Sequence, residues 1–175
     1  ISLNKFENLL DNEYIFNLIP HRNEINIYRT SPINLLSNYR FDIFVKYYYV
    51  KSYIENYNLN EATEIYLSHI KAFNNFHEPD GRKNNANDFI IRFNSLIENV
   101  KSCKNLYKTI IPISTTGIPI DGAHRIAISL YFDFKIQYCV FDLLDGKYDE
   151  TFFLQRGMPY KHVEKIKNIS KKILK

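Results

Sequence analysis

The chain has 175 residues, of which 45% are hydrophobic and 24% charged, a size and composition typical of one globular domain. Five Gly and six Pro are too few for a fibrous or disordered chain, and no apolar run approaches the roughly 18 residues that indicate a membrane span. A formal net charge of +4 is too small to indicate a nucleic-acid binder, which concentrates Lys and Arg on one face.

Residues 1–74 are predicted to form a helical section. Apolar side chains recur at helical spacing over 41–49 and again over 62–73. The polar stretch 56–61 between these segments is short, so we expect the two helices to pack as an antiparallel pair. His69 falls on the apolar stripe of the second helix, where we expect a buried, hydrogen-bonded histidine.

The charged residues at the start of the first helix have two interpretations. Asp42 and Lys46 are four positions apart with the acid first, a spacing that favours an ion pair on the helix surface. Alternatively, Arg40 and Asp42, which lead into a strongly aromatic helix, line the mouth of a pocket and select a substrate.

The remainder of the chain indicates an α+β fold in a single domain, 1–175, with a core over 75–145 and helices over 146–175. The elements expected in the core are a turn over 76–85, a helix over 86–102, a hairpin of strands over 109–114 and 118–120, a helix from Asp121 or Gly122, and a strand over 135–142. Two helices, near 148–154 and from Lys161 onward, are expected to close the chain.

The most informative segment is 118–132, in which a short strand leads directly into Asp121-Gly122 and a helix. Gly122 lets the backbone approach a ligand closely, and the first N–H groups of the helix favour an anion such as phosphate. His124 and Arg125 add donors in the first turn. Asp121 has three open roles: helix cap, metal ligand, or partner of a ribose or substrate hydroxyl. From spacing alone, a capped helix with outward-facing His and Arg is the commoner outcome.

The segment DGAHR at 121–125 resembles the DG-x-HR signature of the ParB/sulfiredoxin-like superfamily, and the order of the expected elements over 75–142 agrees with it. The superfamily includes nucleotide-dependent chromosome-partition proteins, the ATP-using repair enzyme sulfiredoxin and kinases of free serine. The resemblance implies a ParB/sulfiredoxin-like core that binds ATP or ADP, with Mg²⁺, through Gly122, Ala123, His124 and Arg125.

The branches of this superfamily differ at positions that the sequence shows. Sulfiredoxin carries a Cys immediately before the His-Arg of the motif, where this chain has Ala123, so repair chemistry is not expected. Partition proteins continue into a DNA-binding helix-turn-helix region, for which 146–175 is too short. The serine kinases resemble this chain in carrying an acidic residue in the loop before the first core helix, the place of Glu78. Glu78 read alone is also consistent with a solvated loop residue.

The resemblance therefore implies a kinase that phosphorylates a hydroxyl of an amino acid, sugar or polyol. In that interpretation Glu78 is the general base, and His124 and Asp121 lie at the reacting phosphate. Arg156 is a further candidate for binding substrate, although a basic residue before Gly157 is also typical of a helix end. Two alternatives remain: a nucleotide-binding regulatory module that catalyses little, and a ParB-like DNA-associated protein.

The two cysteines, Cys103 and Cys139, match no disulfide or metal-binding pattern, and we expect both to be small buried hydrophobes. No signal peptide is visible in the first ten residues. We therefore expect a cytoplasmic protein whose partners are a nucleotide and a small acceptor, with neither membrane nor nucleic acid. Nothing in the sequence indicates an oligomeric state.

Overall fold

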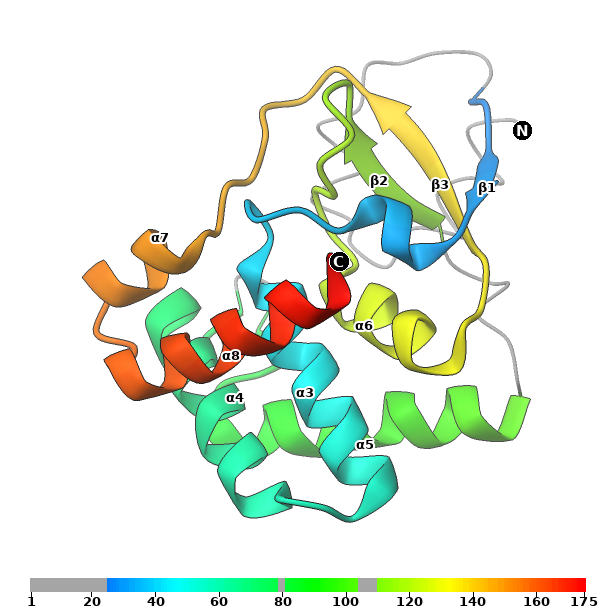
Figure 1. Cartoon of the computed structure of the whole chain (residues 1–175). Coiled ribbons are helices and arrows are strands. Elements are labelled where there is room, and N and C mark those ends of the chain that lie inside the picture. The colour runs from blue at the N-terminus through cyan, green and yellow to red at the C-terminus, as the bar shows by residue number, and fades with distance from the viewer. Residues whose placement is uncertain (1–24, 79–80, 104–109) are drawn as a thin grey trace.

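The computed structural model describes residues 25–78, 81–103 and 110–175 (Figure 1). In chain order the described elements are β1 (Tyr28–Thr30), the 3₁₀ helix η1 (Pro32–Leu35), α3 (Phe41–Glu55), α4 (Leu59–Asn74), α5 (Ala86–Cys103), β2 (Ile110–Ser114), α6 (Ala123–Phe132), β3 (Ile136–Phe141), α7 (Glu150–Gln155) and α8 (Tyr160–Ile173). The fold is α+β, as the sequence predicts. Within the described residues, no helix combines the length and the apolar character needed to cross a bilayer.

The three strands form one small mixed sheet in the order β1-β3-β2. β2 and β3 are parallel, with Ile111 opposite Tyr138, and α6 makes the crossover between them. β1 runs antiparallel to β3, with Tyr28 opposite Tyr138. This topology places the start of α6 directly after the strand β2 and the turn that follows it.

Helix α3 lies at the centre of the helical layer and packs against α4, α6 and α8 (Figure 1). Ten of its fifteen residues are buried, which fits a helix that is apolar on every side. The turn to α4 reverses the chain with two asparagines in left-handed conformation, Asn56 at φ 49° and Asn58 at φ 54°, a role that Asn tolerates well. The predicted antiparallel pair is therefore confirmed.

Two expectations about the strands were wrong. The N-terminal section is not wholly helical, because Tyr28–Thr30 forms an edge strand of the sheet. The stretch 118–120 makes no strand: it joins β2 through the isolated bridge Ile113–Pro119 and two backbone hydrogen bonds, from Ser114 N to Ile118 O and from Ile120 N to Pro112 O. Pairing with β2 is limited to this one bridge and its two flanking hydrogen bonds, so the stretch does not extend into a strand.

Candidate functional site

The start of α6 is fixed by contacts within the chain. Gly122, not Asp121, is the residue before the helix, at φ 88° and without a side-chain cap. A Cβ at this position would overlap Cδ1 of Ile111 on β2 and lie 3.3 Å from Nη2 of Arg125. The glycine is thus required by a left-handed backbone and by close packing on β2. The space that a Cβ would occupy is filled by Ile111, and the N-cap position belongs to Gly122 and not to Asp121.

Arg125 turns inward rather than toward solvent. Its side chain is buried, and Nη2 lies 3.4 Å from Oδ2 of Asp121, whose side chain is 34% exposed. The expectation of an outward-facing Arg is therefore wrong. Asp121 keeps its two remaining roles, as a metal ligand or as a partner of a hydroxyl, because part of its carboxylate faces solvent.

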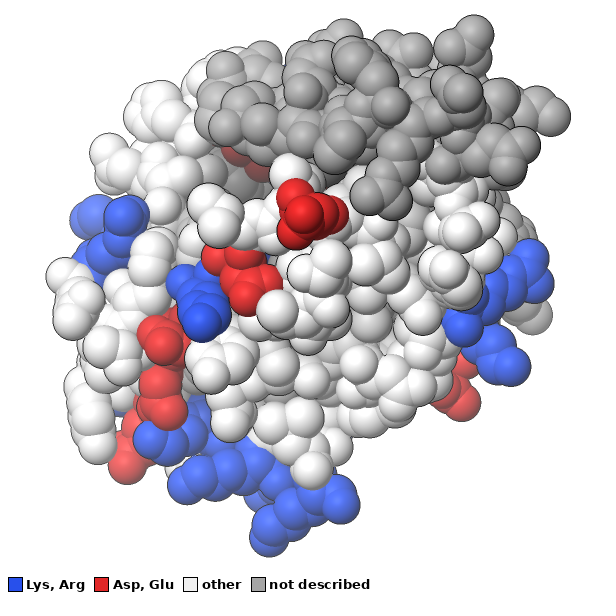
Figure 2. All heavy atoms as spheres, turned by 90° about the horizontal axis from the view of Figure 1, so that it is seen from above, with Lys and Arg blue, Asp and Glu red and all other residues white. Residues whose placement is uncertain are grey.

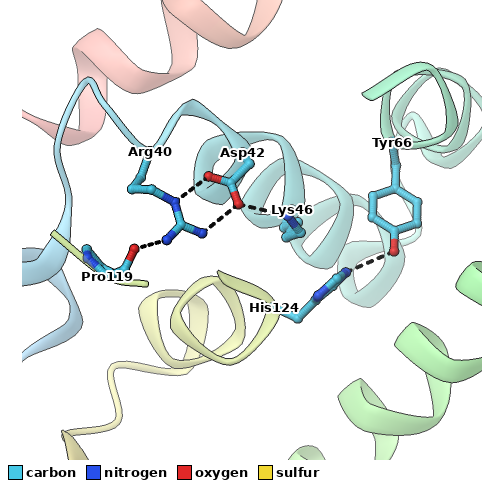
Figure 3. A network of polar contacts seen from close by, with 6 residues as sticks. All are labelled: Arg40, Asp42, Lys46, Tyr66, Pro119 and His124. Carbon is cyan, nitrogen blue, oxygen red and sulfur yellow. Dashed lines mark hydrogen bonds and ion pairs between the residues drawn. The ribbon is translucent and has the colours of Figure 1, made fainter. Parts of the chain in front are cut away.

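His124 extends from the first turn of α6 toward α4 (Figure 3). Its Nε2 lies 2.9 Å from the hydroxyl of Tyr66, and its ring meets Phe93 edge-on at 4.4 Å. Burial, reinforced by the positive charges of Lys46 and Lys83, holds the pKa of His124 well below its ordinary value. His124 is therefore neutral near pH 7 and offers a hydrogen bond, not a charge, to a ligand.

Arg40, Asp42 and Lys46 form a buried charge cluster along α3 (Figure 3). Arg40 donates from Nε to Oδ1 of Asp42 at 2.8 Å and from Nη2 to Oδ2 at 2.9 Å, and it also binds the carbonyl of Pro119. Lys46 Nζ reaches Oδ2 of Asp42 at 3.0 Å. Burial alone would raise the pKa of Asp42, but Arg40 and Lys46 hold it well below its usual range. The expected surface ion pair is therefore wrong, because this face of α3 packs inside the protein.

The buried charge cluster carries an excess of positive charge. Arg40 is 3% exposed, Asp42 3% and Lys46 5%, so within the part of the chain that the structure describes two cations form ion pairs with one carboxylate, that of Asp42. Arg125, the other charged side chain buried among the described residues, is balanced by Asp121. A buried charge without a partner is costly, so the cluster fits a region that receives an anion.

His69 lies on α4 beside this cluster and is wholly buried. Among the described residues, neither of its ring nitrogens has a hydrogen-bond partner. The ring packs 4.7 Å from Phe153 and 6.3 Å from Tyr66. Burial and the charge on Lys46 hold its pKa well below the ordinary value, so the ring is neutral. The sequence-based expectation was right about burial and wrong about the hydrogen bond.

Glu78 belongs to the same neighbourhood. Its Oε1 accepts a hydrogen bond from Lys83 Nζ at 2.7 Å, and its side chain is 24% exposed, so it is not a free solvated residue. The charge on Glu78 acts on the hydroxyl of Tyr66, and the charge on Lys83 acts on His124 and Lys46. Glu78 and Lys83 therefore lie within electrostatic range of Tyr66, His124 and Lys46.

Two residues of this neighbourhood, Tyr66 and Lys83, were missed as functional candidates, and Lys46 was considered only as a member of a surface ion pair with Asp42. Lys46 carried a usable signal, because a Lys within a helix that is apolar all round has no solvent-facing side to occupy. Tyr66 and Lys83 carried none, since only the packing of α4 on α6 and the course of the loop place them there.

Arg156 makes its contacts away from the DGAHR segment. It is exposed, stacks 4.4 Å over Phe152, and directs Nη1 to the carbonyl of Phe73 at 3.4 Å. Gly157 follows at φ 87°. These are the features of a helix end, and within the described residues none of its recorded contacts reaches DGAHR.

The two cysteines differ in burial. Cys139 is buried on β3, and burial raises its pKa to about 12. Cys103 is exposed at the end of α5, which corrects the expectation that both are buried.

The described residues bring no three His, Cys, Asp or Glu side chains together as a metal-binding group. Mg²⁺ commonly relies on one or two carboxylates plus the phosphates of its substrate, and the partly exposed Asp121 fits such a ligand.

A separate groove of about 300 Å³ lies between the beginnings of α3 and α7 and helix α8, lined among others by Tyr39, Glu150 and Lys167. None of the sequence-predicted site residues lines it.

No protein-family model, no curated protein and no solved structure matches this chain.

Proposed function

We propose that the chain is a cytoplasmic kinase that uses ATP or ADP, with Mg²⁺, to phosphorylate a hydroxyl of a small metabolite. The proposal includes a ParB/sulfiredoxin-like core around α6. The observation that carries it is the excess buried positive charge of Arg40 and Lys46 beside the start of α6, with the carboxylate of Glu78 in the same neighbourhood. Phosphoryl transfer depends mainly on positioning and on charge neutralisation, which is what such a site supplies.

In this proposal the backbone N–H groups after Gly122 and the ring of neutral His124 donate hydrogen bonds to nucleotide phosphates. Mg²⁺, when bound beside Asp121, would neutralise phosphate charge. Tyr66 holds the ring of His124 through its 2.9 Å hydrogen bond. Glu78 accepts the proton of the attacking hydroxyl as the new O–P bond forms, and the bond from the terminal phosphorus to the bridging oxygen breaks, so that ATP leaves as ADP or ADP leaves as AMP. Lys83 keeps the carboxylate of Glu78 in place.

The decisive test replaces the carboxylate of Glu78 without changing its size. Glu78→Gln should bind ATP or ADP as the wild type does in calorimetry and should lose phosphate transfer by about a hundredfold or more. Glu98→Gln removes a carboxylate from the surface pair with Lys101 and is the matched control, expected to keep full activity. Transfer by Glu78→Gln at the wild-type rate, in a screen of amino-acid, sugar and polyol acceptors, would remove Glu78 from the mechanism.

One observation favours a second candidate, a nucleotide-binding module without catalysis. Glu78 is ion-paired to Lys83 at 2.7 Å, and a carboxylate held in this way can serve structure alone. This candidate predicts that nucleotide binds, that no acceptor is phosphorylated, and that Glu78→Gln changes neither affinity nor partner choice.

A DNA-associated role has weaker support. On the face shown in Figure 2, Lys and Arg side chains are separated by Asp, Glu and uncharged residues and form no continuous stripe. A DNA binder would show an affinity that falls steeply with salt, because phosphate contacts release counterions.

A further inference from the structure

Two buried polar side chains, Lys46 on α3 and His69 on α4, have donors without a partner among the residues that the structure describes. Among the described residues, Lys46 Nζ makes one hydrogen bond, to Asp42, although an ammonium group has three protons to donate. Neither nitrogen of His69 is bonded, although a neutral imidazole donates one hydrogen bond and accepts another. Such groups are rare in protein interiors, and each is costly unless a ligand or water satisfies it.

The two side chains belong to helices that pack directly on each other. Lys46 is one of the two cations that share Asp42, and His69 stacks against Tyr66, the residue that binds His124. Lys46 and His69 therefore come from α3 and α4, and Figure 3 shows His124 at the start of α6 facing Tyr66 of α4. The side chains of His124, Lys83 and Glu78 in this neighbourhood are partly exposed.

We propose that Lys46 and His69 form a subsite for an oxyanion, a carboxylate or phosphate group carried by the acceptor substrate. An ammonium and a neutral imidazole N–H are both donors, so together they select an anionic oxygen. One negative charge on the ligand would cancel the positive charge that Asp42 leaves uncompensated. That this anion belongs to an acceptor substrate rests on the proposed kinase function. The subsite then restricts the acceptor to hydroxy compounds that also carry an acidic group, which excludes neutral sugars and polyols.

The test uses the intact chain with inorganic phosphate and acetate as probes, followed by calorimetry and by the ¹⁵N signals of the histidine rings. Phosphate or acetate should bind the wild type and shift the His69 signals. Lys46→Met and His69→Phe should each weaken binding about tenfold or more, because each removes a buried hydrogen bond to a charged group. Lys101→Met makes the same change of charge at an exposed position and should bind as the wild type does.

A second titration in saturating ADP separates the possible sources of the anion. If the probe binds with ADP present, the subsite is distinct from the nucleotide phosphates, as proposed. If ADP displaces the probe and shifts the same His69 signals, these residues hold nucleotide phosphate, and the assignment to an acceptor is overturned. Equal binding by the wild type and Lys46→Met would overturn the subsite itself. Absence of ADP binding would count against the kinase while leaving the subsite standing.

Unfolding is excluded as an explanation by a separate readout. Circular dichroism and urea unfolding of each variant should show a native fold, since Lys46→Met keeps the Arg40–Asp42 pair and His69→Phe breaks no hydrogen bond among the described residues. Weaker binding by a stably folded variant is then a property of the subsite.

Discussion

Removal of one charge at a time from the buried charge cluster should have opposite effects on stability, depending on the sign removed. Asp42→Asn leaves Arg40 and Lys46 buried without a carboxylate, and loss of one partner from a buried pair costs about 3–5 kcal/mol. Lys46→Met leaves the two hydrogen bonds between Arg40 and Asp42 intact and returns the cluster to neutrality. Its free energy of unfolding should be unchanged or higher by about 1–2 kcal/mol, within the gains seen when buried ions are replaced by apolar groups.

Urea unfolding at pH 7, followed by circular dichroism, measures both changes. The loss expected for Asp42→Asn is a large part of the roughly 5–15 kcal/mol that stabilises an ordinary domain. Equal losses in Asp42→Asn and Lys46→Met would refute the reasoning, because they would show that Lys46 is a needed partner of the carboxylate and not an excess charge. Lys46→Met with lower affinity for phosphate and undiminished stability would identify Lys46 as a residue kept for binding.

The pH dependence of the free energy of unfolding is a second way to compare the wild type with Lys46→Met. Burial lowers the pKa of Lys46 in the folded protein, so over the alkaline range just below the ordinary lysine pKa the unfolded chain binds more protons than the native one. Stability that comes from this group therefore rises with pH up to about 10.4, the unperturbed value. The rise should be missing in Lys46→Met, which unfolding curves across that range can show.

Three further predictions concern other positions. Gly122→Ala should lower the free energy of unfolding by roughly 2–5 kcal/mol, because the alanine would have to adopt a left-handed backbone and would overpack against β2. Gly117 is also at positive φ but has open space where a Cβ would lie, so Gly117→Ala should lower it by about 1–2 kcal/mol in the same urea assay. Since the folded-state pKa of His69 is lowered, the unfolded chain takes up its proton first. Stability should fall by up to about 1.4 kcal/mol per pH unit below about 6.5, and His69→Phe should reduce that slope. A thiol reagent should label Cys103 in the native protein, and Cys139 only after unfolding, because Cys139 is buried and its pKa is raised to about 12; native labelling of Cys139 would contradict its placement.

Local patterns predicted the helices well, and the reasons are physical. The apolar stripes of α4 and α5 repeat over four turns or more and are buried as expected, with Phe89, Phe93 and Ile97 in the core. A strand of three residues such as Tyr28–Thr30 has no periodicity to detect, and only its pairing with β3 makes it a strand. The stretch 118–120, expected to be a strand, makes only the isolated bridge between Ile113 and Pro119, and three residues offer no periodicity that would show this in advance.

The candidate site was predictable only in part. DGAHR stands out in the sequence, and Glu78 was singled out only through the resemblance, but the spacing of Asp42 and Lys46 is that of a surface pair. Only the packing of α3 against α4, α6 and α8 makes those charges buried and their imbalance significant. Gly122 was singled out correctly as a constrained position, yet its constraint comes from Ile111 on β2 and from its own backbone angle, neither of which can be read from neighbouring residues.

The strand order has a consequence for the order of folding. The segment from Ile110 to Phe141, β2-α6-β3, is continuous in sequence, whereas the pairing of Tyr28 with Tyr138 must close a loop that holds α3, α4 and α5. Loop-closure entropy makes such non-local contacts slow to form. We therefore expect the unit around α6 to fold first and β1 to dock late. The contact between Arg40 and the carbonyl of Pro119 spans the same closure, so the groups that would bind a ligand come together at the end of folding.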